Sequence, residues 1–177
     1  MSMYQILLAG FGGQGVLFAG KFLAYKGLLE GRHVSWLPSY GPEMRGGTAN
    51  CSVILSDTDI GSPIVTRPDI LVAMNLPSLD KYEGKVAPGG TIIYDSALIS
   101  RPLGRTDVKA VALPATKIAS DAGYPTLSNM LLMGALLRYT DAARHDGLEA
   151  ALKKVVSARH QDLYDANLKA VELGYNA

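Results

Sequence analysis

The sequence predicts an α/β fold in which helices cover both faces of a mixed, largely parallel sheet. This is a three-layer α/β/α arrangement within a single domain spanning residues 1–177. Apolar runs at residues 5–9, 69–74 and 91–94 have no interior charge, which is typical of strands buried on both faces. Stretches with helical periodicity lie between them. A chain of 177 residues is long enough to bury one sizeable core.

A glycine-rich stretch, Gly10-Phe11-Gly12-Gly13-Gln14-Gly15, joins the first predicted strand, 4–9, to the first predicted helix, 14–30. Glycine tolerates positive φ, and it lets backbone N–H groups approach a ligand at the positive end of the helix dipole. The stretch therefore predicts an anion or cofactor cradle at Gly12, Gly13 and Gln14. The alternative is a tight turn that packs the first helix on the sheet.

The spacing Gly10-x-Gly12-x-x-Gly15 gives the fold a Rossmann-like beginning, because it matches the dinucleotide-binding pattern in the required strand-to-helix setting. That pattern also needs an acidic residue at the end of the second strand, where it binds a ribose hydroxyl. The second predicted strand, 33–37, ends without one. The sequence thus argues against NAD or FAD as the ligand.

Composition excludes several classes of function. With 17 basic and 16 acidic residues and a net charge of +1, the chain predicts neither nucleic-acid binding nor a polybasic membrane patch. Its single cysteine, Cys51, excludes a disulfide framework and an iron–sulfur cluster held by this chain alone. No signal peptide or membrane span is recognisable, so we expect a cytoplasmic location.

Residues 48–57 alternate between an apolar and a polar face, with Ile54 as the exception. This strand is expected to pair antiparallel with 33–37, which makes the sheet mixed. Its polar face is expected to lack a covering helix, or else to meet a ligand or a partner protein.

The remaining elements follow from turns and periodicity. Ser128 is expected to cap a helix at 129–137 that is apolar all round and therefore buried. Leu163, Ala166, Ala170 and Leu173 predict the inward side of the last helix, with Gly174 as its stop. The other expected elements are a strand at 107–113 and helices at 77–82, at 115–122 and in the first part of 145–174.

A segment rich in proline and glycine, 38–47, follows the second strand and holds two charges, Glu43 and Arg45. We expect it to lie close to the glycine stretch, since both segments follow strands that we take to be parallel neighbours. Arg45 either pairs with Glu43 or presents its guanidinium to a carboxylate or phosphate. Ser39, Tyr40 and Gly46 complete the candidate residues in this segment.

Asn75 follows a predicted strand, and Asn129 begins the buried helix. Both are therefore candidates for the same rim of the candidate site, beside the glycine stretch. The alternative for each is an amide that braces the backbone. No catalytic constellation is recognisable: the three histidines are assigned to a strand start and two covering helices. Cys51 lies on an apolar strand face, as a small buried hydrophobe does.

The motifs at 10–15, 39–47 and 51–53, with Ser56-Asp57 and Ser62-Pro63, resemble the gamma subunits of the 2-oxoacid:ferredoxin oxidoreductases. The resemblance spans nearly the whole chain. It is strongest to the 2-oxoglutarate type, although pyruvate, branched-chain and indolepyruvate types share the motifs. Substrate choice is expected to lie largely in other chains.

The resemblance implies a non-catalytic subunit of a complex that decarboxylates a 2-oxoacid, reduces ferredoxin and forms an acyl-CoA. It places thiamine diphosphate, Mg²⁺ and the iron–sulfur clusters on alpha, beta and ferredoxin-like delta subunits, and coenzyme A is the candidate ligand of this chain. The resemblance also leaves open a homodimer of this chain. The alternative function is a free-standing nucleotide- or acyl-CoA-binding domain.

Overall fold

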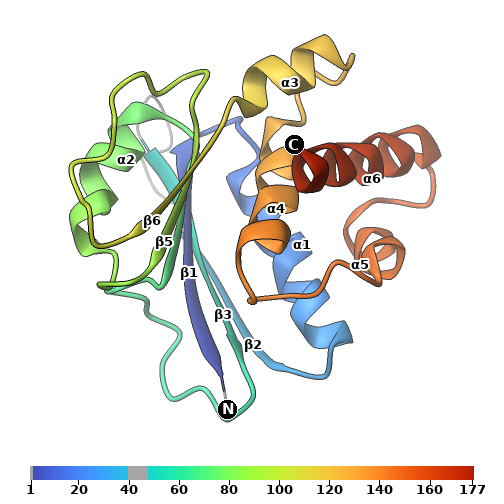
Figure 1. Cartoon of the computed structure of the whole chain (residues 1–177). Coiled ribbons are helices and arrows are strands. Elements are labelled where there is room, and N and C mark those ends of the chain that lie inside the picture. The colour runs from blue at the N-terminus through green and yellow to red at the C-terminus, as the bar shows by residue number, and fades with distance from the viewer. Residues whose placement is uncertain (1, 40–47) are drawn as a thin grey trace.

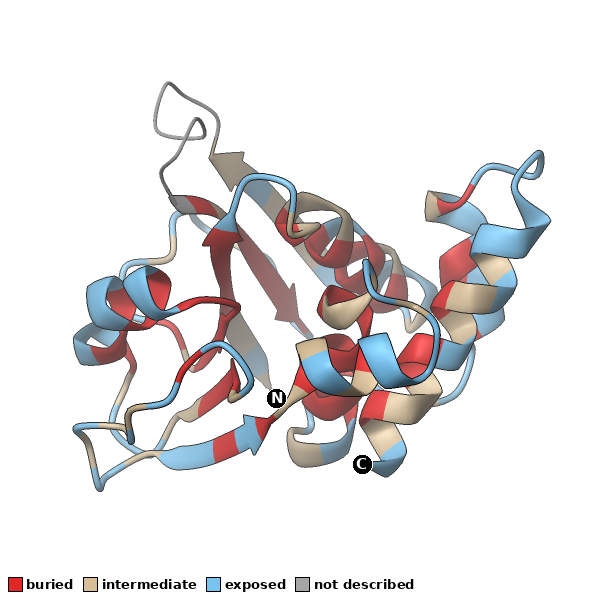
Figure 2. Cartoon of the chain, turned by 90° about the horizontal axis from the view of Figure 1, so that it is seen from above, coloured by how far each residue is buried: buried red, intermediate tan, exposed pale blue. Residues whose placement is uncertain are grey.

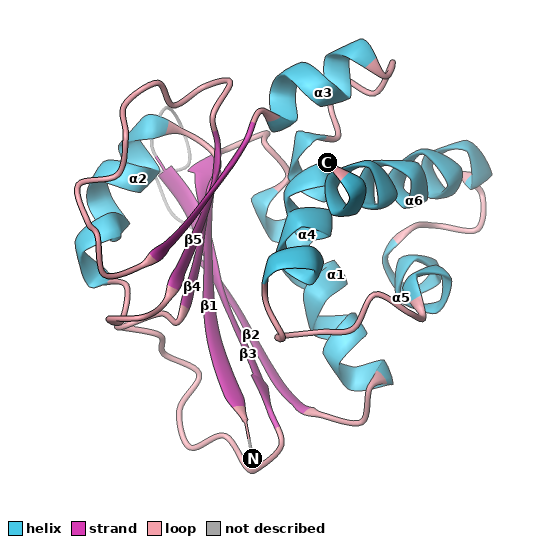
Figure 3. Cartoon of the chain, viewed as in Figure 1, coloured by secondary structure: helices cyan, strands magenta, loops and turns pink. Residues whose placement is uncertain are grey.

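The computed structural model describes residues 2–39 and 48–177, and a single six-stranded sheet organises them (Figures 1 and 3). The strand order is β2-β3-β1-β4-β5-β6. β3 is antiparallel to both β2 and β1, whereas β1, β4, β5 and β6 pair in parallel, which confirms the mixed sheet. The strands are β1 (Met3–Phe11), β2 (His33–Ser39), β3 (Thr48–Ser56), β4 (Ile70–Ala73), β5 (Thr91–Asp95) and β6 (Lys109–Leu113).

Helices cover the two faces of the sheet unequally, and the three-layer expectation is confirmed (Figure 1). Among the described helices, one face carries only α2 (Leu76–Tyr82), which continues into a 3₁₀ turn at Glu83–Lys85. The other face carries α1 (Val16–Leu29), α3 (Ala115–Asp121), α4 (Ser128–Tyr139), α5 (Leu148–Val155) and α6 (Gln161–Asn176). Each face has its own apolar core, and the inner strands β3, β1, β4 and β5 are mostly buried, whereas β2 and β6 are mostly intermediate or exposed (Figure 2).

The expectation that the first two strands are neighbours is wrong. β3 lies between β1 and β2 and pairs with both, because its alternating sequence supplies an antiparallel strand at that position. β1 and β2 nevertheless run in the same direction, since both oppose β3. Their carboxyl ends therefore lie at the same edge of the sheet, with Phe11 opposite Thr48 and Ser39 opposite Asn50.

The apolar helix α4 is buried from Asn129 to Leu137, as its sequence predicts, and α6 packs against it. The helices cross at glycines: a Cβ on Gly134 would strike the Val171 carbonyl, and one on Gly174 would strike the Leu131 carbonyl. Gly174 is thus a close-approach residue inside α6, and the expectation that it ends the helix is wrong.

Two further expectations about these helices are corrected. Ser128 is the first residue of α4 and its hydroxyl caps nothing, since the position before the helix is Leu127, without a side-chain cap. On α6 the expected inward residues Ala170 and Leu173 are buried or packed against the core, but Leu163 is exposed, and Asn167, Val171 and Gly174 face inward as well. The glycine contact rotates the helix so that its small residues meet α4.

The polar face of β3 lies on the side of the sheet that carries α2, and Asn50 Nδ2 donates to the Tyr82 hydroxyl oxygen of that helix at 3.1 Å. The expectation that no helix covers this face therefore holds only in part, and the face is largely buried. Ser52 and Ser56 are 8% and 0% exposed. The irregular chain that follows β3 covers this face, and the Thr58 N–H donates to Ser56 Oγ at 3.0 Å. The loop thus pairs the Ser56 hydroxyl, while α2 reaches this face at Asn50.

Candidate functional site

The glycine-rich stretch forms a tight loop between β1 and α1. Gly13 and Gly15 have φ of 93° and 75°, a region that favours glycine, and the Gln14 N–H donates to the Phe11 carbonyl at 3.2 Å to close the turn. Gly12 and Gly13 are exposed, and a Cβ on Gly13 would meet no atom within 4 Å. The loop backbone is therefore accessible from outside.

The side chain of Gln14 points back into the loop and fixes it. Its Oε1 accepts from the Phe11 N–H at 2.7 Å and from Asn75 Nδ2 at 3.0 Å, while its Nε2 donates to the Met74 carbonyl at 3.2 Å. Asn75 also caps α2, because its Oδ1 accepts from the Ser78 N–H at 2.9 Å. Gln14 and Asn75 thus act as backbone-bracing amides, and their role toward a ligand remains a prediction.

Asn129 ties the start of α4 to the same loop. Its Nδ2 donates to the Gly15 carbonyl at 3.1 Å, and a Cβ on Gly15 would strike this amide, so the loop requires glycine here. The Asn129 Oδ1 is buried and has no hydrogen-bond partner within the described residues. An unpaired buried acceptor costs about 1–3 kcal/mol, so a donor brought to it would be stabilising.

A hollow of about 290 Å³ lies over the loop and the first turn of α1. The N–H groups of Val16, Leu17 and Phe18 have no acceptor in the described part of the chain, whereas the Ala19 N–H already donates to the Gly15 carbonyl at 3.0 Å. The hollow is lined by Phe11, Gly12, Gly13, Gly15, Val16, Leu17, Phe18 and Ala49.

The charge of this hollow comes from the backbone alone, since none of its lining residues carries a charge. Unpaired N–H groups at the start of a 14-residue helix carry about half a positive elementary charge. This arrangement suits an anion such as a phosphate, and it offers no general acid, base or nucleophile. The candidates predicted from the sequence did not include the N–H groups of residues 16–18. A helix that begins directly after a glycine loop does predict such unpaired N–H groups.

The other candidate residues are only partly placed. Ser39 ends β2, opposite Asn50, at the edge of the sheet where the glycine loop lies. Tyr40, Glu43, Arg45 and Gly46 lie outside the described residues. The structure thus brings Gly12, Gly13, Gln14, Asn75 and Asn129 together at one edge, as the sequence predicts, and the proposed roles of Arg45 and Glu43 remain predictions.

The histidines take no part in this site. His33 begins β2, as expected, and lies 3.4 Å from Asp59, while His160 precedes α6. His145 is expected on a helix but lies in the turn before α5. Its Nε2 lies 2.9 Å from Glu172 Oε2.

Cys51 is buried against α1, and we expect it to be unreactive. Burial raises the pKa of its thiol from 9.0 to about 12. Native protein at pH 8 should therefore not react with Ellman's reagent, whereas unfolded protein should release one equivalent. Above pH 9 the unfolded thiol ionises while the folded thiol stays protonated, so stability should fall with rising pH. Rapid labelling of the native protein would contradict this prediction.

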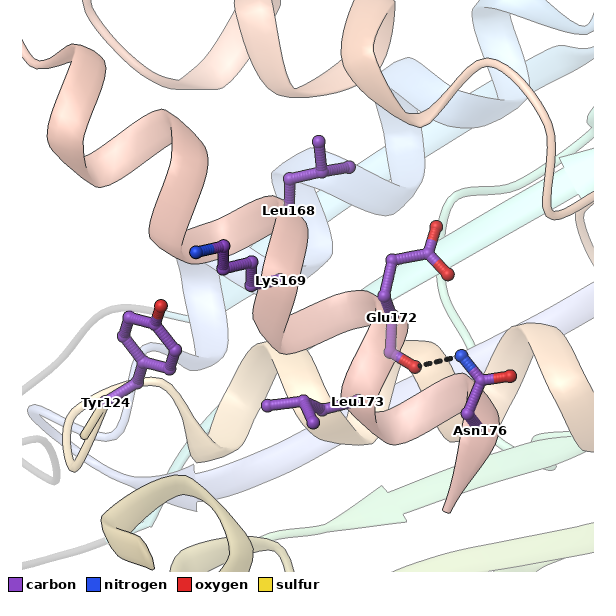
Figure 4. Close-up of a pocket in the computed structure, with 6 residues that line it drawn as sticks. All are labelled: Tyr124, Leu168, Lys169, Glu172, Leu173 and Asn176. Carbon is purple, nitrogen blue, oxygen red and sulfur yellow. Dashed lines mark hydrogen bonds between the residues drawn. The ribbon is translucent and has the colours of Figure 1, made fainter. Parts of the chain in front are cut away.

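A larger hollow, of about 510 Å³, lies along α6 and away from the loop (Figure 4). Tyr124, Leu168 and Leu173 give it a mainly apolar lining. Lys169, Glu172 and Asn176 also border it, and Asn176 Nδ2 donates to the Glu172 carbonyl at 2.8 Å. It lacks the convergent backbone donors of the loop, so its size does not make it the better candidate.

Within residues 2–39 and 48–177, no group of three or more histidine, cysteine, aspartate or glutamate side chains is arranged to hold a metal ion. None of the helices described there is both long and apolar enough to cross a membrane.

Comparison with known proteins gives the family. The sequence profile described as pyruvate ferredoxin/flavodoxin oxidoreductase matches residues 5–177. The ketoisovalerate oxidoreductase subunit VorA of Methanothermobacter thermautotrophicus is 41% identical over 96% of this chain, which spans only 35% of that relative. The 2-oxoglutarate synthase subunit KorC of Methanocaldococcus jannaschii is 34% identical over 97% of this chain and 91% of its own.

Solved structures agree with the sequence relatives. The gamma subunit of a keto/oxoacid ferredoxin oxidoreductase from Geobacter sulfurreducens has a TM-score of 0.83 and 28% identity, covering 98% of this chain and 96% of its own. A 2-oxoglutarate:ferredoxin oxidoreductase from Magnetococcus marinus, described with 2-oxoglutarate, coenzyme A and succinyl-CoA bound, shares the fold with a TM-score of 0.88. The two sequences are 24% identical, and the aligned region covers 99% of this chain and 31% of that chain.

The resemblance to gamma subunits found in the sequence is confirmed by these relatives. The prediction of a 2-oxoglutarate type stays a prediction, because the ketoisovalerate relative is more similar than the 2-oxoglutarate relative just described. The chain belongs to the pyruvate ferredoxin/flavodoxin oxidoreductase family.

Proposed function

We propose that this chain is the gamma-type part of a 2-oxoacid:ferredoxin oxidoreductase, and that its glycine loop binds the phosphate groups of coenzyme A. In the proposed reaction a 2-oxoacid loses CO₂ and its acyl group joins the coenzyme A sulfur. The two electrons released pass to ferredoxin. The observation that supports this role is the loop itself, where unpaired N–H groups at the start of α1 line an accessible hollow without side-chain charge.

Coenzyme A fits the chemistry of the hollow. Its pyrophosphate is an anion of the kind that glycine loops at helix starts bind through backbone N–H groups. The N–H groups of Gly13 and of Val16, Leu17 and Phe18 would hold the phosphates, while Gln14 and Asn129 keep the loop in shape. The Magnetococcus structure, which shares this fold, is described with coenzyme A bound, and this supports the choice of ligand.

The rest of the chemistry is proposed to lie on partner subunits. A single buried cysteine cannot hold a four-thiolate cluster, so iron–sulfur clusters would belong to other chains, as would thiamine diphosphate and Mg²⁺. The chain spans nearly all of KorC but about a third of VorA. The same unit therefore occurs alone and within a longer chain, which supports close association with alpha and beta subunits.

A pair of substitutions at one position tests the coenzyme A site. Gly13→Asp and Gly13→Asn introduce side chains of the same shape, both tolerant of positive φ, into open space, and they differ in charge. Gly13→Asp should weaken coenzyme A binding to the purified chain by roughly tenfold relative to Gly13→Asn, since a carboxylate would repel phosphate at the helix start. Calorimetric titration of both variants measures this ratio.

The outcomes separate the two parts of the proposal. Equal affinities of the two variants would exclude the loop as the coenzyme A site. Reduction of a viologen dye that depends on a 2-oxoacid and coenzyme A, in the complex co-purified with this chain, tests the subunit role independently. If the chain purifies alone and binds coenzyme A or a nucleotide by itself, the free-standing binding domain replaces the subunit.

A further inference from the structure

A third hollow, of about 250 Å³, lies on the sparsely covered face of the sheet. This is the face that carries α2 (Figure 1). The floor of the hollow is the polar face of β3, at Asn50 and Ser52, and its walls are Tyr82 at the end of α2 and the irregular chain at 65–68. It is distinct from the hollow over the glycine loop, which lies at the start of α1 and shares none of these residues.

Hydroxyl donors line this hollow. Asn50 Nδ2 donates to the Tyr82 hydroxyl oxygen at 3.1 Å, so the hydroxyl proton of Tyr82 remains free to donate elsewhere. Ser52 lines the hollow too, and its hydroxyl is available to donate into it. The hollow therefore offers the hydroxyl protons of Tyr82 and Ser52 to an acceptor that enters it.

One positive charge accompanies these donors. Lys85 is the only charged residue that lines the hollow in the described part of the chain, and its Nζ lies 5.4 Å from the centre of the Tyr82 ring. Lys81 lies at a similar 5.3 Å from the same ring but does not line the hollow. Of the other lining residues, Leu7, Val65 and Pro68 are apolar and Thr66 carries a further hydroxyl.

We propose that this hollow binds a small monocarboxylate with a short hydrocarbon body. Two hydroxyl donors and one ammonium group match the two oxygens and the single charge of a carboxylate. The apolar residues beside them suit a hydrocarbon body better than a phosphate, which carries about two negative charges at pH 7 and no apolar part. The volume lies below that of a site for a drug-sized ligand. This inference does not rest on the proposed function.

Titration of the ¹⁵N-labelled full chain with isobutyrate tests the proposal by NMR. We expect saturable shifts of the backbone amides of Ser52, Thr66 and Lys85. Isobutyramide, which has the same shape without the charge, should produce none. Inorganic phosphate should bind more weakly than isobutyrate. Phosphate binding as tight as isobutyrate, or equal shifts with the amide, would overturn the carboxylate assignment.

Two lysine variants provide the matched control. Lys85→Met should weaken isobutyrate binding roughly tenfold, as expected for a lost charge-assisted hydrogen bond. Lys81→Met should change it by less than about twofold, because Lys81 lies beside the same ring but outside the hollow. Ser52→Ala, a small change at a buried position, should also weaken binding. Equal affinities for both lysine variants would show nonspecific attraction and refute the site.

Discussion

Replacing Gly174 with alanine is expected to destabilise the protein by about 3 kcal/mol, the upper end for overpacking, because the new Cβ would collide with the backbone carbonyl of Leu131. Neither helix can yield locally, since the obstacle is main chain in the buried helix α4. Intrinsic helix propensity works in the opposite direction, favouring alanine over glycine by about 1 kcal/mol. A loss of stability would therefore show that α4 and α6 are in close backbone contact at Gly174. Urea denaturation followed by circular dichroism measures it.

The matched control is Gly61→Ala, since a Cβ on Gly61 would meet nothing within 4 Å. It should change the free energy of unfolding by less than about 1 kcal/mol. Gly134→Ala, which faces the Val171 carbonyl at the same crossing, should behave like Gly174→Ala. Denaturation midpoints that are the same for all three variants would mean that α4 and α6 are not packed this closely.

Removing the buried cation Lys26 should have a similarly large effect. Lys26 and Glu30, one turn apart on α1, pair at 3.0 Å with side chains 2% and 6% exposed. Lys26→Met keeps most of the volume but removes the nearer and buried cation beside the Glu30 carboxylate, which we expect to cost about 3 kcal/mol. The other cation, Arg144 Nε, lies 3.7 Å away on a side chain that is 67% exposed, so it compensates weakly. The Arg144 N–H still donates to Glu30 at 3.1 Å, so the fold should persist.

Lys117 and Asp121 supply the comparison, because they have the same spacing on α3 but are 70% and 66% exposed. Lys117→Met should change stability by less than about 0.5 kcal/mol. The double variant Lys26→Met with Glu30→Gln, which removes both buried charges, should recover much of the loss. If Lys26→Met were as mild as Lys117→Met, burial would not decide the strength of these pairs.

Sequence patterns predict elements well where one physical requirement dominates. The uncharged runs of β1 and β4 cannot be placed anywhere but in a covered sheet, and α4 is apolar on all sides and buried on all sides. Strand order is a different matter. Alternation in β3 predicts an antiparallel strand, but nothing local tells whether it lies at the edge or between β1 and β2.

The same distinction holds for the candidate site. The glycines at 10–15 predict the loop, and the position of Asn75 after a strand predicts an amide that hydrogen-bonds to the backbone. The contacts between Gln14 and Asn75 and between Asn129 and Gly15 join residues 61 and 114 positions apart, so sequence spacing cannot reveal them. On α6 the apolar periodicity identifies Ala170 and Leu173 but not Gly174, because the close approach of the two backbones there involves no apolar side chain.

The order of the sheet leaves β2 and β6 at its two borders. A border strand presents free backbone groups to which another copy of the chain could add a strand. β2 contains Pro38, which has no N–H to offer such a neighbour, and β6 begins with Lys109, whose charge discourages close approach. These residues at the borders of the sheet oppose its continuation from one molecule into the next. Association of two copies by continuing the sheet is therefore disfavoured at both of its borders.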